Sequence, residues 1–274
     1  MSAELSPTRH VYFSRTEDNP FLPAFYIEQL KQDLDPKLAR RMLYGEWVEI
    51  TTDVIYHAYS ERANYRPVSY AVDTLLPIAI AWDFNIGEGK PLSTCFSQVT
   101  LEKGQPAFHF FAEVVVEGAS TEEACQEMAD RGLLDHDTDY LIYGDATGGA
   151  KSTKSKLSDY DIMRKFFANY RTPDGRAMSF RMEVPLSNPP IRTRHNIVNA
   201  YCKNDAGRHR LFVYKDCPTL NKGFKLTALK PGGKYIEDDS KPYQHVTTAA
   251  GYQIVRVHNT QRTSGPRVFS RKVR

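Results

Sequence analysis

Two stretches decide the fold of this chain: IAIAWDFN (residues 78–85) and YLIYGDATG (residues 140–148). Each is an apolar run with the composition of a β-strand, and each ends on an aspartate followed by a small or polar turn. A carboxylate at the end of a buried strand is costly unless it is hydrogen-bonded, paired or bound to a cation. Either aspartate alone is equally well explained as the cap of the turn that follows it. Together, Asp83 and Asp145 predict two strand ends that converge on a shared metal ion.

The elements around these stretches follow the order of an α/β domain. Strands are expected at 78–83, 93–101 and 108–116, and the short turns between them predict an antiparallel three-strand meander. Ser120 and Glu123 form a capping box at the start of a helix. The strand at 140–145 follows this helix and is therefore expected to lie parallel in a mixed sheet.

The remaining elements complete a sheet flanked by helices. The segments around PGG (231–233), at 224–228 and 234–237, predict an added β-hairpin. A meander followed by helix, strand and helix, with aspartates on the first strand and on the strand after the helix, is the order of an RNase H-like domain. Further helices are expected at 158–170, 191–201 and 246–257, and further strands at 178–183 and 211–214.

The chain is predicted to have three parts. Residues 1–48 form a lead-in segment with a short strand at 10–13 and two helices divided at Asp35-Pro36. Residues 49–260 form the RNase H-like domain, and residues 261–274 form a basic C-terminal tail. With 274 residues, 41% of them hydrophobic, the chain is long enough for one large domain with appendages.

The basic residues are clustered, although the formal net charge is only +3. No acidic residue follows Asp239, and a second basic group comes soon after Asp145. Such runs are often solvated faces or tails, but beside a metal site they are what a protein that binds a phosphate backbone needs. The residues predicted to contact DNA are Lys151, Lys154, Lys156, Arg267, Arg271 and Lys272.

Several other classes of protein are disfavoured. The four cysteines lack CxxC spacing, which argues against a structural zinc site and fits reduced thiols in a cytosolic protein. Neither a signal peptide nor an apolar run of the ~20 residues needed to cross a bilayer is found, so no membrane partner is expected. The alternating Asp135, Asp137 and Asp139 lack the glycine and terminal glutamate of an EF-hand and predict a solvated loop.

The segment GDATGGAKS (144–152) comes close to a phosphate-binding P-loop. In that motif the second glycine is followed at once by lysine, whereas here Ala150 separates Gly149 from Lys151. Asp145 would also repel a triphosphate. An NTPase is therefore the weakest of the functional hypotheses.

Six short motifs, in a fixed order, resemble one known family. They are DNPFL (18–22), RRMLYGEW (40–47), AWDFN (81–85), GDATG (144–148), NPPIR (188–192) and HVTTAAGY (245–252). Together they resemble the C-terminal nuclease domain of the large terminase subunit of tailed bacteriophages, and the resemblance covers almost the whole chain.

The resemblance implies an RNase H-like endonuclease that cuts concatemeric double-stranded viral DNA during genome packaging. Asp83 and Asp145 would be its catalytic metal ligands, with two Mg²⁺ or Mn²⁺ ions bound. It also implies the portal and the small terminase subunit as partners and the cytoplasm of an infected bacterium as the location. The family's N-terminal ATPase is not found, because no true P-loop occurs, which implies a domain or fragment of a longer motor protein.

Thr248 departs from the pattern of this family. The closing motif normally reads His-x-x-Asp-Ala, and its aspartate is the third metal ligand. A hydroxyl is a poor ligand for a hard cation, and it lowers the negative charge of the site by one. The site is then weak or inactive, or Asp238 or Asp239 supplies the oxygen, or one metal suffices until a DNA phosphate completes the second site. The alternative function is a catalytically silent DNA-binding or docking module of the packaging motor.

Overall fold

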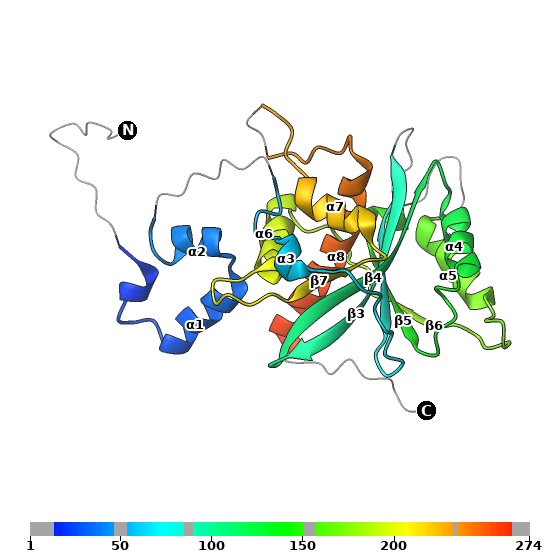
Figure 1. Cartoon of the computed structure of the whole chain (residues 1–274), viewed down its shortest axis with the longest axis horizontal. Helices are drawn as coiled ribbons and strands as arrows, with labels where there is room; N and C mark the ends of the chain where they lie inside the picture. The colour runs from blue at the N-terminus through cyan, green and yellow to red at the C-terminus, as the bar shows by residue number, and fades with distance from the viewer. Residues whose placement is uncertain (1–13, 47–53, 85–89, 151–156, 233–234, 265–274) are drawn as a thin grey trace.

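A seven-stranded mixed sheet forms the centre of the molecule in a computed structural model that describes residues 14–46, 54–84, 90–150, 157–232 and 235–264 (Figure 1). The strand order is β1-β7-β4-β3-β2-β5-β6. The strands are β1 (Tyr65–Arg66), β2 (Ile78–Asp83), β3 (Pro91–Glu102), β4 (Gln105–Glu117), β5 (Asp139–Gly144), β6 (Ser179–Met182) and β7 (Leu211–Tyr214).

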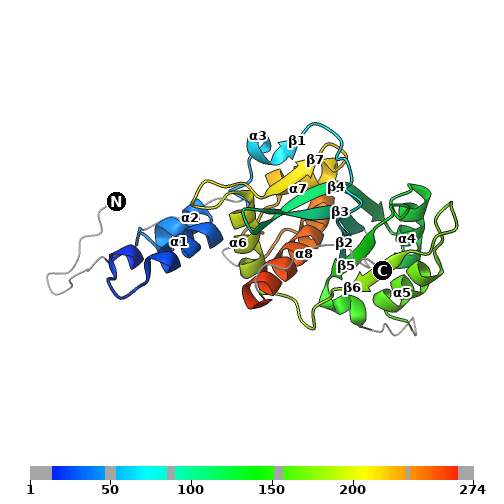
Figure 2. The same ribbon diagram turned by 90° about the horizontal axis from the view of Figure 1, so that it is seen from below.

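Helices cover both faces of this sheet (Figures 1 and 2). One face carries α6 (Ile191–Cys202), α7 (Pro218–Leu226) and α8 (Pro242–Ser264), and the other carries α4 (Thr121–Asp130) and α5 (Asp159–Asn169). The other helices are η1 (Thr16–Asp18), α1 (Ala24–Asp33), α2 (Pro36–Met42), α3 (Glu61–Asn64) and η2 (Ala146–Gly149). The predicted α/β architecture, a mixed sheet flanked by helices, is confirmed.

The predicted meander and crossover are both present. β2 pairs antiparallel with β3, and β3 pairs antiparallel with β4. Lys103 and Gly104 make the tight turn between β3 and β4 with φ values of 51° and 77°, as this kind of turn requires. The capping box at α4 is formed: Ser120 N donates to Glu123 Oε2 at 2.8 Å. The chain then enters β5, which pairs parallel with β2.

The side chains of β2 alternate between two hydrophobic cores, one on each face of the sheet. Ala79 and Ala81 pack in the core on the α6–α8 side, whereas Ile80 and Trp82 pack in the core on the α4–α5 side. Successive side chains of a strand point to opposite faces. Asp83, the next residue, therefore falls on the α8 side.

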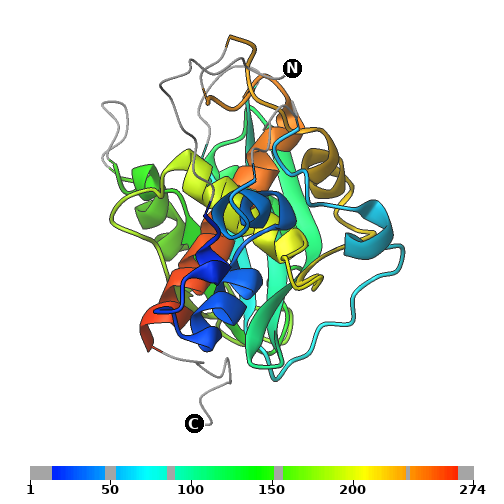
Figure 3. The same cartoon turned by 90° about the vertical axis from the view of Figure 1, so that its left-hand side faces the viewer.

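The N-terminal helices lie at one end of the molecule, beside α6 (Figures 2 and 3). The chain divides at Asp35-Pro36 as predicted, because Asp35 Oδ1 accepts hydrogen bonds from the backbone N–H groups of Lys37 and Leu38. Tyr44 Oη donates to Asp205 Oδ2 at 2.8 Å and ties this segment to the loop after α6. The strand predicted at residues 10–13 lies outside the described residues, and the separate lead-in segment over 1–48 stays a prediction.

The predicted hairpin around Pro231 is only partly correct. The strand expected at 224–228 is wrong over its first residues, since Pro218–Leu226 forms α7. Leu220 and Phe224, one helical turn apart, are buried in the core on the α8 side. A short antiparallel contact remains, in which Leu229 bridges Glu237 and Lys230 N donates to Ile236 O at 2.8 Å. Residues 233–234 lie outside the described part of the chain.

The last helix is longer than predicted. The expected range was 246–257, whereas α8 begins at Pro242 and continues to Ser264, into the predicted tail. Its buried apolar residues, Val246, Ala249, Ala250, Ile254 and Val257, recur at three and four positions and pack on the sheet. No helix in the described ranges has both the length and the apolar character needed to cross a membrane.

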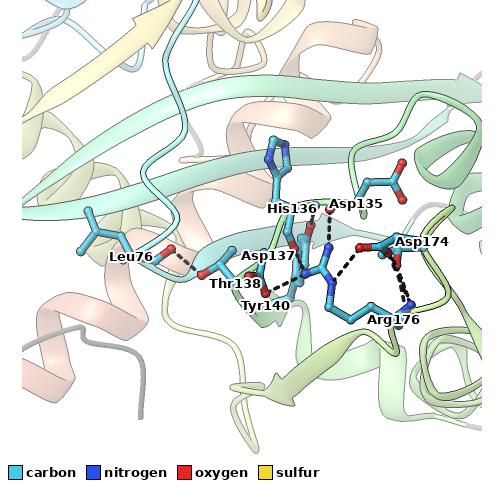
Figure 4. A network of polar contacts seen from close by, with 9 residues as sticks. Leu76, Asp135, His136, Asp137, Thr138, Tyr140, Asp174 and Arg176 are labelled. Atoms are coloured by element: carbon cyan, nitrogen blue, oxygen red, sulfur yellow. Dashed lines mark hydrogen bonds and ion pairs between the residues drawn. The ribbon is translucent and has the colours of Figure 1, made fainter. Parts of the chain in front are cut away.

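Two of the alternating aspartates, Asp135 and Asp137, make contacts that hold the loop before β5 (Figure 4). Arg176 donates to Asp137 Oδ1 at 2.8 Å and to the carbonyl oxygens of Asp135 and His136 at 2.9 and 3.3 Å. Asp135 Oδ1 also accepts from Tyr170 Oη at 2.6 Å. These contacts tie the loop before β5 to the turn before β6.

His109, on β4, is expected to make folding stability depend on pH. Burial, and next the charge of Arg66, lower the pKa of His109 to about 4, whereas it is about 6.5 in an unfolded chain. Between these two pH values the His109 imidazole is protonated in the unfolded chain and neutral in the folded protein. The free energy of unfolding therefore falls as the pH drops from about 6.5 to 4, by up to about 3 kcal/mol.

The measurement is the free energy of urea unfolding at several pH values for the unmodified chain and His109→Gln. Glutamine can still hydrogen-bond the two neighbours of His109, Thr100 Oγ1 at 3.0 Å and Tyr214 Oη at 3.2 Å. The variant should lose less stability over this pH range. Equal losses for both proteins would contradict the assignment.

Candidate metal centre

The sheet brings Asp83 and Asp145 to neighbouring positions. β2 and β5 are adjacent and parallel, and the last pair in their register is Trp82 with Gly144. Asp83 and Asp145 are the next residues on the two strands, which lie about 4.8 Å apart in such a sheet. The predicted convergence of the two strand ends is therefore present.

Asp83 is held on the α8 side of the sheet. It is only 6% exposed, and its Oδ2 lies 3.0 Å from Nδ1 of His245 on α8. In the tautomer that carries its proton on Nδ1, the His245 ring donates a hydrogen bond to this carboxylate. The contact therefore orients the carboxylate at the end of β2.

Asp145 both caps a turn and faces α8. Its Oδ1 accepts hydrogen bonds from Thr147 N at 2.6 Å and Asn188 Nδ2 at 2.7 Å, so the capping explanation holds for this residue. Its Oδ2 accepts from Tyr252 Oη at 3.2 Å. Burial raises the pKa of Tyr252, and the Asp83 and Asp145 carboxylates raise it further against the opposing effect of Arg194, so this phenol stays a donor at neutral pH.

One face of α8 carries the third position. His245, Thr248 and Tyr252 are spaced by three and four residues and so lie on the same side of the helix. Thr248 is buried, and its Oγ1 accepts from Gln244 Nε2 at 2.9 Å and from Arg194 Nη2 at 3.5 Å. The residue at the predicted third-ligand position therefore contacts a cationic side chain.

Arg194 belongs to a buried ion pair. Its Nη2 lies 2.5 Å from Glu237 Oε2, and Glu237 Oε1 lies 2.8 Å from His195 Nε2. Burial alone would raise the pKa of Glu237, but the hydrogen bond from His195 and the charge of Arg194 lower it to about 2. Glu237 is thus ionised at neutral pH and forms an ion pair with Arg194.

Asp238 and Asp239 are engaged elsewhere. Asp239 pairs with Lys90 and Lys230, each at 2.5 Å, and Asp238 Oδ1 accepts from Ser240 N at 3.1 Å. Across the described ranges, no three His, Cys, Asp or Glu side chains are grouped so that they could hold a metal ion. The alternative in which Asp238 or Asp239 completes the ligand set is therefore not supported.

The side chains that are present fit one hard cation better than two. Asp83 and Asp145 supply carboxylate oxygens, the ligands that Mg²⁺ and Mn²⁺ prefer. Thr248 supplies one neutral oxygen that already accepts two hydrogen bonds. The pair fits a divalent ion, and the third position does not fit a second one.

No protein-family model and no curated protein matches this sequence. Among solved structures, the large terminase of a thermophilic bacteriophage is similar with a TM-score of 0.59 at 12% identity, over 88% of this chain and 54% of that one. The P22 large terminase nuclease domain is similar with a TM-score of 0.52 at 14% identity, over 80% and 94%. The chain has the fold of a phage large-terminase nuclease domain.

This terminase nuclease fold confirms the predicted RNase H-like class. The chain spans 54% of the length of the thermophilic phage's large terminase. A more distant match is the SPP1 large terminase nuclease domain with bound Mn, with a TM-score of 0.43 at 12% identity over 71% of this chain and 97% of that one.

Two glycines, Gly144 at the end of β5 and Gly148 after it, allow close packing in this terminase nuclease fold. A Cβ atom on Gly148 would lie 2.5 Å from Phe84 Cε2 and 3.0 Å from Tyr160 Cε2. A Cβ on Gly144 would lie 2.7 Å from Tyr160 Oη. The resemblance to a P-loop is therefore explained by close contacts of the loop with two aromatic rings.

Gly148→Ala is expected to lower the free energy of unfolding by about 1–3 kcal/mol, because an added methyl group in a packed site forces neighbours to shift. Gly149→Ala is the matched control, since its Cβ would meet nothing closer than Tyr160 Cδ2 at 3.9 Å. Urea unfolding of both variants measures the difference. Equal stability of the two variants would contradict the packing explanation.

The structure describes the predicted metal ligands but not the predicted DNA-contacting residues. Asp83 and Asp145 lie at the ends of adjacent strands, and Thr248 lies on α8 between the two residues that contact them. The six predicted DNA-contacting residues lie outside the described residues. Sequence reasoning missed Arg194, Glu237, His245 and Tyr252 as neighbours of the centre. The helical spacing of 245, 248 and 252 could have indicated His245 and Tyr252, but nothing in the sequence links Arg194 to Glu237.

Proposed function

We propose that this chain is the metal-dependent endonuclease domain of a viral packaging terminase and cleaves phosphodiester bonds of concatemeric double-stranded DNA. The observation that carries the proposal is the pair of carboxylates, Asp83 and Asp145, at adjacent parallel strand ends beneath α8. Carboxylate clusters on rigid strand ends are the usual anchors of hard cations in phosphodiester hydrolysis.

Asp83 and Asp145 would hold the Mg²⁺ or Mn²⁺. When bound, such an ion supplies a water of lowered pKa and positive charge for the phosphate oxygens. The protein's own contribution is orientation: His245 positions Asp83, and Asn188, Thr147 and Tyr252 position Asp145. Partners of this kind fix the direction of a metal ligand and raise its effectiveness.

The wider setting is part of the same proposal. A packaging nuclease acts on DNA at the portal of the viral shell together with the small terminase subunit, in the cytoplasm of the infected bacterium. The terminase nuclease fold and the greater length of the thermophilic phage's large terminase support a role within a longer motor protein.

A catalytically silent DNA-binding or docking module is the second candidate. The observation that favours it is Thr248 in contact with the Arg194 guanidinium, where the sequence motif leads one to expect a carboxylate. Loss of one negative ligand charge weakens cation binding and would leave the fold intact.

Incubation of supercoiled plasmid with Mg²⁺, with Mn²⁺ and with EDTA separates the two candidates. A nuclease converts the plasmid to nicked and linear forms with a divalent ion and not with EDTA. A silent module retards the plasmid on a gel and leaves it supercoiled in all three conditions. Cleavage that persists in EDTA would contradict a metal-dependent enzyme.

The basic cluster after Asp145 is proposed to bind the DNA backbone. Replacing Lys151, Lys154 and Lys156 together by alanine should lower the slope of log affinity against log salt by about 3, since each lost phosphate contact removes about 0.9. Fluorescence anisotropy with a labelled duplex at several salt concentrations measures this slope. Lys165→Ala, an exposed change on α5, is the control; an unchanged slope in the triple variant would exclude these lysines from the DNA contact.

A further inference from the structure

Thr248 lies between the two contacts that join α8 to the carboxylates. One turn before it, His245 Nδ1 lies 3.0 Å from Asp83 Oδ2, and one turn after it, Tyr252 Oη lies 3.2 Å from Asp145 Oδ2. The three residues share one face of the helix. Thr248 therefore holds the position from which α8 would add a third ligand.

Arg194 reaches this position from α6 across Gly251. A Cβ on Gly251 would lie 2.8 Å from Arg194 Cδ, so only a glycine lets the arginine pass this close to α8. The guanidinium carbon then lies 5.1 Å from the centre of the Tyr252 ring, and Nη2 lies 3.5 Å from Thr248 Oγ1. The positive charge is thus placed against the third-ligand position.

This charge is fixed in place. Arg194 is only 2% exposed and is paired at 2.5 Å with Glu237. Glu237 is held in turn by His195 at 2.8 Å, and His195 Nδ1 lies 2.8 Å from Tyr235 Oη. A guanidinium does not lose its proton at any pH at which proteins fold. Because water is largely excluded, salt screens this charge much less than it would at the surface.

We propose that the centre holds one divalent cation, bound by Asp83 and Asp145, and that Arg194 excludes a second cation beside Thr248. The inference rests on the proposed function for the existence of the metal site and departs from the two-ion mechanism predicted from the sequence. Of the Arg194–Glu237 ion pair, it is the guanidinium that contacts Thr248, so a cation beside Thr248 would meet the positive partner first. Like charges in a dry site repel strongly, and Thr248 offers only one neutral oxygen in compensation.

The same geometry predicts that Thr248→Asp alone does not create a second cation site. An aspartate at 248 would meet Arg194 Nη2 and Gln244 Nε2, the two groups that now donate to Thr248. Among the described residues, Arg194 Nε has no hydrogen-bond partner, so the guanidinium has a donor left for such a carboxylate. The new carboxylate would pair with Arg194 instead of creating a second cation site.

Mn²⁺ binding to the full chain tests this directly, with free Mn²⁺ followed by electron paramagnetic resonance. The single variants are Asp83→Asn and Thr248→Asp. A triple variant combines Thr248→Asp with Arg194→Met and Glu237→Gln. A control combines Thr248→Asp with Arg192→Met. Removing both partners of the Arg194–Glu237 pair avoids leaving a lone buried charge. Arg192 is exposed on the same helix, so Arg192→Met controls for the loss of one positive charge.

The unmodified chain, Thr248→Asp and the Arg192 control are expected to bind one Mn²⁺ each, and the triple variant two. If the unmodified chain or Thr248→Asp binds two ions, the inference is overturned whatever the triple variant does. A folded triple variant that binds only one ion would also overturn it. No binding by the unmodified chain, or equal binding by Asp83→Asn, would instead overturn the proposed metal site.

Discussion

Asp83→Asn is expected to lower the rate of Mn²⁺-dependent plasmid cleavage by at least about a hundredfold. Even residues that only orient a metal ligand cost about 10–100-fold when they are removed, and Asp83 is proposed to be a ligand itself. Asparagine keeps the size of the side chain and can still accept a hydrogen bond from His245, now 3.0 Å away. The loss would therefore report the missing negative charge. The rate at which supercoiled plasmid disappears at saturating Mn²⁺ is the measurement.

Asp137→Asn is the matched control for this change. Asp137 is a carboxylate paired with Arg176 at 2.8 Å, in the loop before β5. Its cleavage rate should equal that of the unmodified chain. If Asp83→Asn cleaves as fast as the control, the strand-end carboxylate has no part in catalysis. If the unmodified chain does not cleave, the result supports the catalytically silent module. The Mn²⁺ affinities of Asp83→Asn and Asp137→Asn are then compared instead of their cleavage rates.

Arg194→Met is expected to lower the free energy of unfolding by about 3–5 kcal/mol, because it leaves the buried Glu237 carboxylate without its cationic partner. Both side chains of the pair are almost fully buried, so water cannot replace the lost contact. His195 remains beside Glu237 but is buried, and burial lowers the pKa of its imidazole, which opposes its becoming a full cation. Urea unfolding at pH 7, followed by circular dichroism, measures the loss.

Two further variants separate charge from packing at this position. Arg194→Met with Glu237→Gln should be more stable than Arg194→Met alone, since replacing both ions of a buried pair is often nearly neutral. Arg164→Met removes an exposed partner of Asp161 at 3.1 Å and should cost at most about 0.5 kcal/mol. If Arg194→Met is no less stable than the Arg164 variant, the buried pair does not stabilise the fold in the way described.

The elements that the sequence predicted well are those with strong local signals. The capping box at Ser120, the proline after Asp35 and the apolar run of β2 each act over a few residues, so they survive whatever the rest of the chain does. The parallel direction of β5 followed from chain connectivity, since a helix precedes it, and the structure identifies β2 as its partner.

The element that failed shows where local signals stop. The segment around Phe224 has strand-forming residues near a turn, but packing of Leu220 and Phe224 in the core made it the helix α7. Gly223 allows α7 to lie against the start of α8, where a Cβ would be 2.5 Å from Tyr243 O. Tertiary packing routinely overrides weak local preferences of this kind.

The sequence by itself determined that two apolar strands end on aspartates and that Thr248 stands where a third carboxylate is expected. Those facts depend on residue identity and order along the chain. Only the tertiary structure decided what surrounds Thr248, because Arg194, Glu237 and α8 meet through packing between segments far apart in sequence. The charge at a site depends on every group brought within a few ångströms of it, and that distance is set by the fold.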